Sequence, residues 1–149
     1  DERYGIFTFT LMIHKKIDSL VYYIRVIDNR YFVYAMCPIL VDPQDKDLMA
    51  TLAEFVCRAN TAHIEGSFGL DMDSGQISYK YIVDCSRITL DEELIFESIS
   101  IPREVWEIFA DGIFDIIKGN KSAKEVIDAF WETNRPLDDG MEIRIKWRV

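Results

Sequence analysis

The sequence predicts an α+β fold in which an antiparallel sheet carries helices packed on one of its faces. Three observations predict it: three successive segments alternate with a period of two, an amphipathic run follows Asp42-Pro43, and a hairpin signature surrounds Asp73-Ser74-Gly75. Alternation is typical of strands, and a single apolar stripe is typical of a helix that covers a sheet. We therefore expect a three-strand meander, a helix, a hairpin and then further helices, all within one domain spanning residues 1–149.

The three strands of the meander are predicted at 6–13, 19–27 and 31–37. In the first, aromatic and aliphatic residues share one face and threonines the other, while the second alternates over its whole length. Asp28-Asn29-Arg30 is predicted to turn the chain, because Asp and Asn tolerate left-handed conformations. The third strand is apolar on both faces, which indicates a strand covered from two sides.

A helix is predicted from Asp42-Pro43 to Asn60, with Asp42 accepting from first-turn amides and Pro43 at the first helical position. Asn60 is expected to end it in the left-handed conformation. A hairpin should follow, pairing 67–72 with 76–85. Its three-residue connection suits a glycine at positive φ, Gly75.

Helices are predicted for most of the remaining chain. Thr89 begins a capping pattern with Glu92, but residues 90–98 also alternate, so an extended segment is equally compatible. Pro102 is predicted to open a helix that runs to Lys118 and is ended by Gly119-Asn120. Ser122 opens a further helix to Thr133. The 102–118 helix carries more apolar residues than one stripe needs. We expect the surplus to form an interface with another chain, made by Val105, Trp106, Phe109, Ile113, Phe114 and Ile117.

An additional strand is predicted at the C-terminus, over residues 141–149. Five apolar residues alternate strictly with Glu142, Arg144, Lys146 and Arg148. One apolar face and one charged face are typical of an edge strand. The sequence does not indicate which strand it pairs with.

Composition excludes several classes of partner and of environment. The net charge of −9 repels phosphate backbones, so neither nucleic acid nor a membrane surface is an expected partner. No apolar run approaches the length of a membrane-spanning helix. Cys37, Cys57 and Cys85 are odd in number and widely spaced, which favours reduced thiols and a cytoplasmic protein.

No motif predicts catalysis, a cofactor or a metal. Asp71, Asp73 and Gly75 invite comparison with an EF-hand loop, but the glycine stands fifth rather than sixth and Ile82 occupies the twelfth position. Turn chemistry is therefore the expected role of this segment. His14 and His63 have no neighbours at metal-ligand spacing. We expect no catalytic, cofactor-binding or metal-binding residues.

The order of elements resembles the fold of type III secretion chaperones, and more specifically the YbjN-like family of small bacterial proteins. The resemblance rests on three segments, Ala53–Asn60, Gly66–Asp71 and Gly75–Tyr79. In that family a helix ending in Asn leads into a Gly-x-Phe strand, an acidic-Gly turn and a strand with alternating aromatics. A leading helix usual in the family has no counterpart after Asp1, and the 141–149 strand is an addition. The resemblance implies dimerisation and protein binding, and it transfers no catalytic residues.

The sequence therefore favours a non-enzymatic protein-interaction or regulatory module of YbjN-like type that forms a homodimer and binds a partner protein. One alternative is a chaperone for an unfolded segment of a secreted protein. Another is a small-molecule binder or enzyme, which would require a pocket lined by Tyr22, Tyr79 or Tyr81 with converging polar groups.

Overall fold

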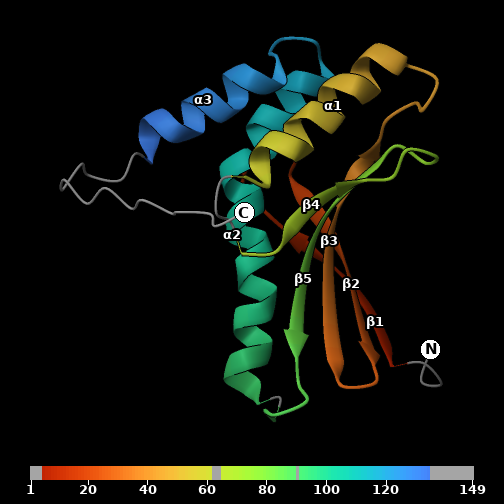
Figure 1. Ribbon diagram of the computed structural model, residues 1–149, viewed down its shortest axis with the longest axis vertical. Helices are drawn as coiled ribbons and strands as arrows, with labels where there is room; N and C mark the ends of the chain where they lie inside the picture. The colour runs from red at the N-terminus through yellow and green to blue at the C-terminus, as the bar shows by residue number, and fades with distance from the viewer. Residues whose placement is uncertain (1–4, 62–64, 90, 135–149) are drawn as a thin grey trace, which may run out of the picture.

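The computed structural model describes residues 5–61, 65–89 and 91–134, and within them the α+β class is confirmed (Figure 1). Five strands form one open, fully antiparallel sheet in the order β1-β2-β3-β5-β4. Three helices accompany it. The elements are β1 (Ile6–Met12), β2 (Ser19–Ile27), β3 (Arg30–Leu40), α1 (Lys46–Ala59), β4 (Ser67–Leu70), β5 (Gln76–Asp84), α2 (Glu92–Ile117) and α3 (Ala123–Thr133).

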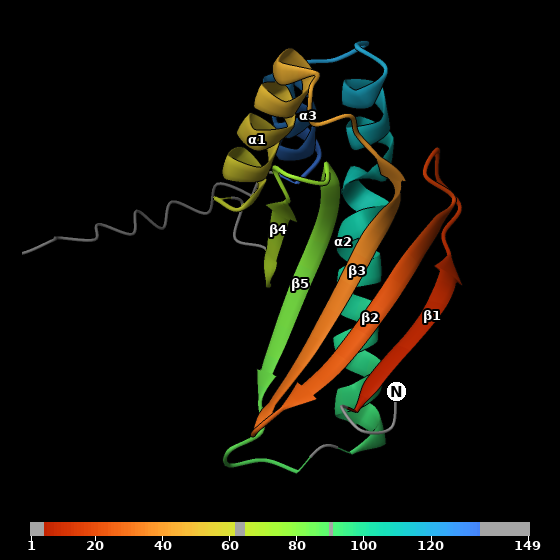
Figure 2. The same ribbon diagram turned by 90° about the vertical axis from the view of Figure 1, so that its right-hand side faces the viewer.

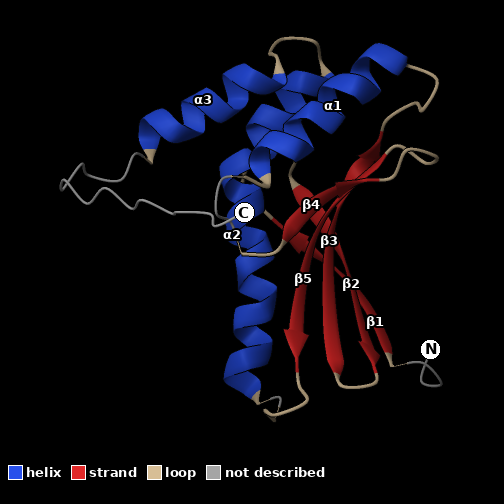
Figure 3. Cartoon of the chain, in the orientation of Figure 1, coloured by secondary structure: helices blue, strands red, loops and turns tan. Residues whose placement is uncertain are grey.

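The described helices lie on one side of the sheet, as the sequence predicted (Figure 3). α2 runs along β3 and β5, α1 packs on β4, and α3 packs on α1 and α2. Figure 2 looks onto the opposite face of the sheet, with α2 behind the strands. The helices therefore bury one face and leave the other without a helical cover in the described part of the chain.

A single hydrophobic core fills the space between the sheet and the helices. At its centre the Phe68 ring makes edge contacts with Phe55, Tyr79, Trp106 and Phe109, with ring centroids 5.0 to 5.7 Å apart. The buried Trp106 indole N–H donates to the Ala35 carbonyl at 3.1 Å. This bond fixes α2 directly to the middle of β3, because the indole is fully buried and its donor must be satisfied.

The two predicted turns of the sheet are confirmed. Asp28 adopts φ 52° between β2 and β3, the left-handed conformation that Asp tolerates. Gly75 adopts φ 70° before β5. In the same turn the Asp71 carboxylate accepts from the amides of Asp73 and Ser74 at 2.9 and 3.1 Å. The Asp73 bond is the larger cause of an Asp71 pKa below the usual value, so this carboxylate serves the turn.

The predicted start of α1 is wrong, whereas its predicted end at Asn60 is confirmed in position but not in conformation. The helix begins after Asp45, whose side chain accepts from the Leu48 amide at 3.1 Å, while Asp42 accepts from Gln44 in the preceding turn. Asn60 is right-handed, with φ −68°. Its side-chain amide instead donates to the Phe68 carbonyl and accepts from the Phe68 amide, at 3.1 and 2.8 Å. The Asn60 side chain therefore forms, with the Phe68 backbone of β4, the two hydrogen bonds that the backbone of an adjacent strand would otherwise form.

The predicted start of a helix at Pro102 is wrong, because α2 passes through this proline without interruption. Asp91 caps the helix by accepting from the Leu94 amide at 2.9 Å. Pro102 lacks the amide that would bond to Ser98, a loss that costs about 3 kcal/mol in an isolated helix. Both residues are buried, and α2 as a whole packs against β3 and β5. The predicted capping box of Ser122 with Glu125 and the helix end at Gly119 are confirmed.

The loop between β1 and β2 attaches to the C-terminal half of α2 through an ion pair. Ile13 and Ile17 are buried, and Lys16 Nζ lies 2.5 Å from one Asp115 carboxylate oxygen. Lys121 Nζ lies 3.5 Å from the other oxygen. The hydrogen bond from Lys16 is the largest cause of an Asp115 pKa below its usual value. The ion pair therefore favours the folded state while Asp115 is charged.

This arrangement predicts a pH-dependent effect of replacing Asp115 by asparagine. A carboxyl group whose pKa is lowered on folding adds stability above its unfolded pKa of about 4 and loses it as pH falls through the folded value. The variant should therefore unfold at lower urea concentration than the unmodified protein at pH 7, with the difference shrinking towards pH 3. The exposed Asp128, which pairs with Lys124 on α3, provides the control. A gap that persists unchanged at pH 3 would contradict the assignment.

The predicted strand at 141–149 lies outside the described residues. None of the described helices is both long and apolar enough to cross a membrane.

Candidate functional site

The helix surface predicted to bind another chain is largely part of the core. Val105, Trp106, Phe109 and Ile113 are at most 8% exposed, and Phe114 and Ile117 are partly buried against the same core. The first four side chains therefore do not form the exposed surface that the sequence predicted. The physical reason is that α2 is covered on several sides, since it contacts β3, β5, α1 and α3 within one chain. The wide apolar surface of the helix is satisfied internally.

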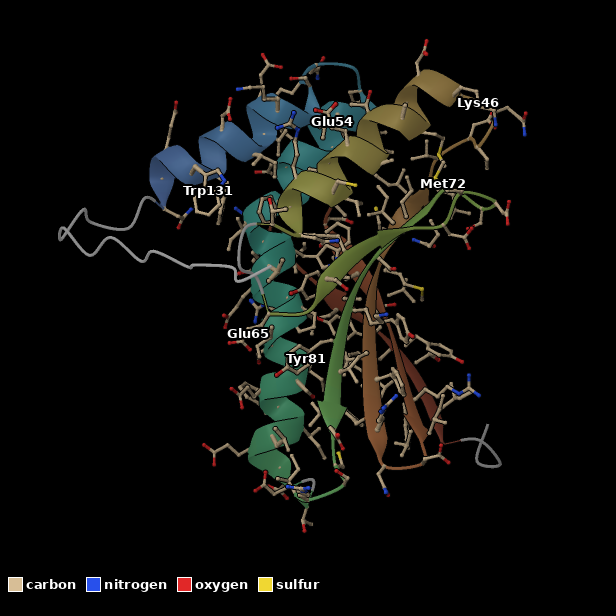
Figure 4. The ribbon with its side chains drawn as sticks, viewed as in Figure 1. Lys46, Glu54, Glu65, Met72, Tyr81 and Trp131 are labelled. Atoms are coloured by element: carbon tan, nitrogen blue, oxygen red, sulfur yellow. The ribbon has the colours of Figure 1, made fainter. Side chains whose placement is uncertain are left out.

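The tyrosines considered for a ligand pocket pack inside the molecule. Tyr22 and Tyr79 are fully buried, and Tyr81 is half-buried on β5 beside α2 (Figure 4). Burial is the main cause that raises the pKa of the Tyr22 and Tyr79 hydroxyls above the usual tyrosine value. Tyr22 donates to the Ile99 carbonyl of α2 at 2.9 Å. The Tyr79 hydroxyl is buried without a hydrogen-bond partner among the described residues.

Because only the Tyr22 hydroxyl has a hydrogen-bond partner within the described part of the chain, replacing each tyrosine by phenylalanine is expected to affect the free energy of unfolding differently. Tyr22→Phe removes a hydrogen bond and should lower the free energy of unfolding by about 1 kcal/mol. Tyr79→Phe removes an unsatisfied buried hydroxyl and should leave the free energy of unfolding unchanged or raise it by up to about 1 kcal/mol. Urea titrations of the two variants, which serve as each other's control, measure the difference. Equal destabilisation would show that the Tyr79 hydroxyl has a partner in solution.

The candidate site lies on the opposite side of the sheet, on side chains of β2, β3 and β5 that point away from the helices. The register places them in rows across the three strands. We call this set the outer face; it consists of Val21, Tyr23, Arg25, Ile27, Arg30, Phe32, Tyr34, Met36, Ser78, Lys80, Ile82 and Asp84.

Aromatic rings dominate the centre of the outer face. Tyr34 lies between Tyr23 and Phe32, with ring centroids 6.2 and 6.5 Å away. All three rings are half-buried, and Ile27 and Ile82 are 38% and 43% exposed. The rings, Arg25, Ile27 and Met36 line a shallow hollow of about 420 Å³. Contiguous exposed apolar surface of this kind marks interaction sites in folded proteins.

Three of the four charged groups of the outer face are basic, although the whole chain has a net charge of −9. Arg25 and Lys80 stand within the aromatic rows, paired in register with Phe32 and Tyr34. At the end of the sheet Arg30 is paired with Asp84, whose carboxylate also accepts from the Ser86 amide at 2.9 Å. That backbone bond is the largest cause of an Asp84 pKa below the usual value. The aromatic rows therefore combine apolar surface with two cations that no carboxylate in those rows neutralises.

Sequence reasoning missed the outer face, although a signal was present. The segment 31–37 is apolar on both faces, a pattern that predicts a strand covered from two sides. The structure covers its Tyr31, Val33, Ala35 and Cys37 face only. The apolar side chains on the opposite face of this strand, Phe32, Tyr34 and Met36, therefore belong to a surface that no described helix covers. Arg25 and Lys80 on neighbouring strands were the additional signal that this surface contacts solvent.

The described residues do not present a metal site, since no group of three or more His, Cys, Asp or Glu side chains converges there. Comparison with known proteins gives no further indication: no family model, no curated protein and no solved structure matches this chain.

Proposed function

We propose that this chain is a non-enzymatic protein-binding module of the YbjN-like, secretion chaperone-like type, acting in the cytoplasm, and that its outer face is the binding surface. The partner is a segment of another protein that presents apolar side chains beside carboxylates. The observation that carries the proposal is the aromatic centre of the outer face, around Tyr34, which no described helix covers.

The apolar part of the partner follows from the composition of the surface. Tyrosine, phenylalanine, methionine and arginine are the residue types enriched in protein interfaces, and all four occur on the outer face. Tyr34 stands between two other rings, so ordering it on binding costs little conformational entropy. Such a side chain has the properties of a binding hot spot.

The acidic part of the partner follows from charge complementarity. Arg25 and Lys80 flank the aromatic rows and would pair with carboxylates of the bound segment. Asp84 is the only one of the described acidic residues within these rows of β2, β3 and β5, so most of the negative charge lies on other surfaces, which would repel an acidic partner. Binding should therefore weaken as salt concentration rises.

Selection from a displayed peptide library tests the proposal with a defined probe. Peptides enriched on the full chain should combine aromatic or aliphatic residues with Asp or Glu. Replacing Phe32 and Tyr34 together by serine should weaken their binding at least ~10-fold, since hot-spot side chains are removed. Phe96→Ser, at a residue 73% exposed on α2, is the matched control and should leave binding unchanged.

Two outcomes would contradict the proposal. Peptides that bind the Phe32/Tyr34 double variant as tightly as the unmodified chain would place the binding surface elsewhere. Conversion of a dimer into a monomer by the same double variant would show that the outer face contacts a second copy instead. Circular dichroism of each variant establishes that the fold is retained.

A further inference from the structure

The aromatic rings of the outer face stand on strands whose backbone is already paired. Tyr23 lies on β2, Phe32 and Tyr34 lie on β3, and each of these strands has a hydrogen-bonded neighbour on both sides. A segment that lies over these rings therefore obtains no backbone hydrogen bonds from the strands beneath it. In an extended segment the backbone groups turned towards the rings would lose water without gaining partners, which is costly. A helix bonds these groups within itself, so the surface favours a helical partner.

The dimensions of the outer face also suit a helix. On the opposite side of the same sheet α2 runs along β3 and β5, and a second helical layer is a usual way to close the other apolar face of a sheet (Figure 2). From the row of Ile27 and Arg30 to the row of Val21 and Met36 the outer face extends six residues along β3, about 20 Å. A helix of about 13 residues spans that length.

Two cations stand on either side of the ring cluster and are offset along it. Arg25 on β2 is in the row of Phe32, and Lys80 on β5 is in the row of Tyr34. Two strand spacings, about 10 Å, separate the two cations across the sheet, and one row, about 7 Å, separates them along it. No ion pair among the described residues includes either cation. Both are therefore available to carboxylates of a bound segment.

The handedness of this offset matches a right-handed helix. In Figure 2 the outer face is towards the viewer, β3 runs upwards, β2 lies to its right and β5 to its left. Lys80 therefore stands above and to the left of Arg25. On the sheet-facing side of a helix that runs upwards, the fifth residue after a given one stands in the same relation to it, about 7.5 Å along the axis and about 140° around it. The relation is unchanged when the helix runs downwards.

We propose that the segment bound by the outer face is an amphipathic α-helix with carboxylates at positions i and i+5 and apolar side chains at positions i+1 and i+4. The apolar pair faces Phe32 and Tyr34. The two carboxylates lie on the flanks of the apolar stripe, one beside Arg25 and the other beside Lys80. This inference rests on the function proposed above and specifies the conformation and the charge spacing of the partner.

A designed peptide of 14 residues with blocked ends tests the spacing on the full chain. It carries leucine at its positions 2, 6, 9 and 13, glutamate at its positions 5 and 10, and alanine or glutamine elsewhere. The control peptide has the same composition but carries its glutamates at positions 4 and 11, on the side of the helix opposite the leucines. Isothermal titration calorimetry at low salt should show about 5-fold tighter binding of the first peptide, because it gains two exposed ion pairs.

Charge reversal on the chain identifies which carboxylate meets which cation. Arg25→Glu and Lys80→Glu should each weaken binding of the designed peptide. A peptide with lysine in place of the glutamate at position 5 should restore binding to one variant only, and a peptide with lysine at position 10 should restore binding to the other. Proline at peptide position 8 should weaken binding to the unmodified chain at least ~10-fold, since proline interrupts a helix but is tolerated in an extended segment.

The results that would overturn the inference are distinct from a failure of the proposed function. Peptides from the displayed library that tolerate proline throughout, yet lose binding to the Phe32/Tyr34 double variant, would show an extended segment on the outer face and leave the proposed function standing. Restoration of both charge-reversed variants by lysine at the same peptide position would exclude the i, i+5 spacing. If neither the designed nor the selected peptides depend on Phe32 and Tyr34, the inference and the proposed function fail together.

Discussion

Replacing Trp106 by alanine is expected to lower the free energy of unfolding by about 3–5 kcal/mol, the range for a buried tryptophan. The indole is fully buried, contacts the Phe68 ring and donates to the Ala35 carbonyl. Its removal opens a cavity and leaves that carbonyl without the indole donor. Urea unfolding monitored by far-ultraviolet circular dichroism measures the decrease in the free energy of unfolding. This signal reports on the backbone and does not depend on tryptophan fluorescence, which the substitution itself changes.

Ile108→Ala is the matched control, because Ile108 lies on the same helix and is 51% exposed. Its effect should stay within about 0.5 kcal/mol, as is usual for surface positions. If Trp106→Ala instead left the free energy of unfolding unchanged and dissociated a complex, the α2 surface would be an interface after all. The pair of variants therefore separates a core role of α2 from a binding role.

Gly75→Ala is expected to lower the free energy of unfolding by more than about 3 kcal/mol, a size reached only through strain or loss of buried packing. Gly75 adopts φ 70°, which an alanine resists. A Cβ at this position would also lie 1.8 Å from the Val41 carbonyl oxygen, which is backbone and cannot rotate away. The turn before β5 would have to separate from the end of β3.

Gly119→Ala separates the two causes of destabilisation expected at Gly75, namely the positive φ and the steric clash with Val41. Gly119 has φ 71°, but a Cβ there would meet nothing within 4 Å. It should therefore cost only about 1–2 kcal/mol, the conformational penalty alone. Thermal and urea unfolding of both variants give the comparison. Equal losses at the two glycines would show that the turn relaxes away from Val41.

Much of the fold could be predicted because its signals are local. The turn at Asp28, the positive φ of Gly75 and the capping box at Ser122 each depend on a few neighbouring residues. The continuity of α2 could not be predicted from Pro102. Its cost is offset by burial of residues on both sides of the proline, and burial depends on distant strands.

The candidate site shows a second limit of sequence reasoning. Alternation on β2 and β3 assigns side chains to two faces, but it does not say which face the helices cover. Val33 and Tyr34 are adjacent in the sequence, and both have large side chains with apolar surface. Val33 is buried under the helices, whereas Tyr34 lies on the face of the sheet that no described helix covers. The large number of apolar residues on α2 predicts an interface with another chain only if the helix packs on one side. In the structure α2 contacts two strands and two helices, and these contacts cannot be inferred from the sequence of the helix alone.

Methyl NMR with a selected peptide tests the central claim most directly, namely that the outer face binds a segment of another protein. Labelled methionine and isoleucine methyl groups report on the outer face at Met36 and Ile82, on the core at Met49, and on exposed α2 at Ile108. Binding is predicted to shift the Met36 and Ile82 signals while those of Met49 and Ile108 stay in place. A shift at Ile108 with Met36 and Ile82 unmoved would contradict the account.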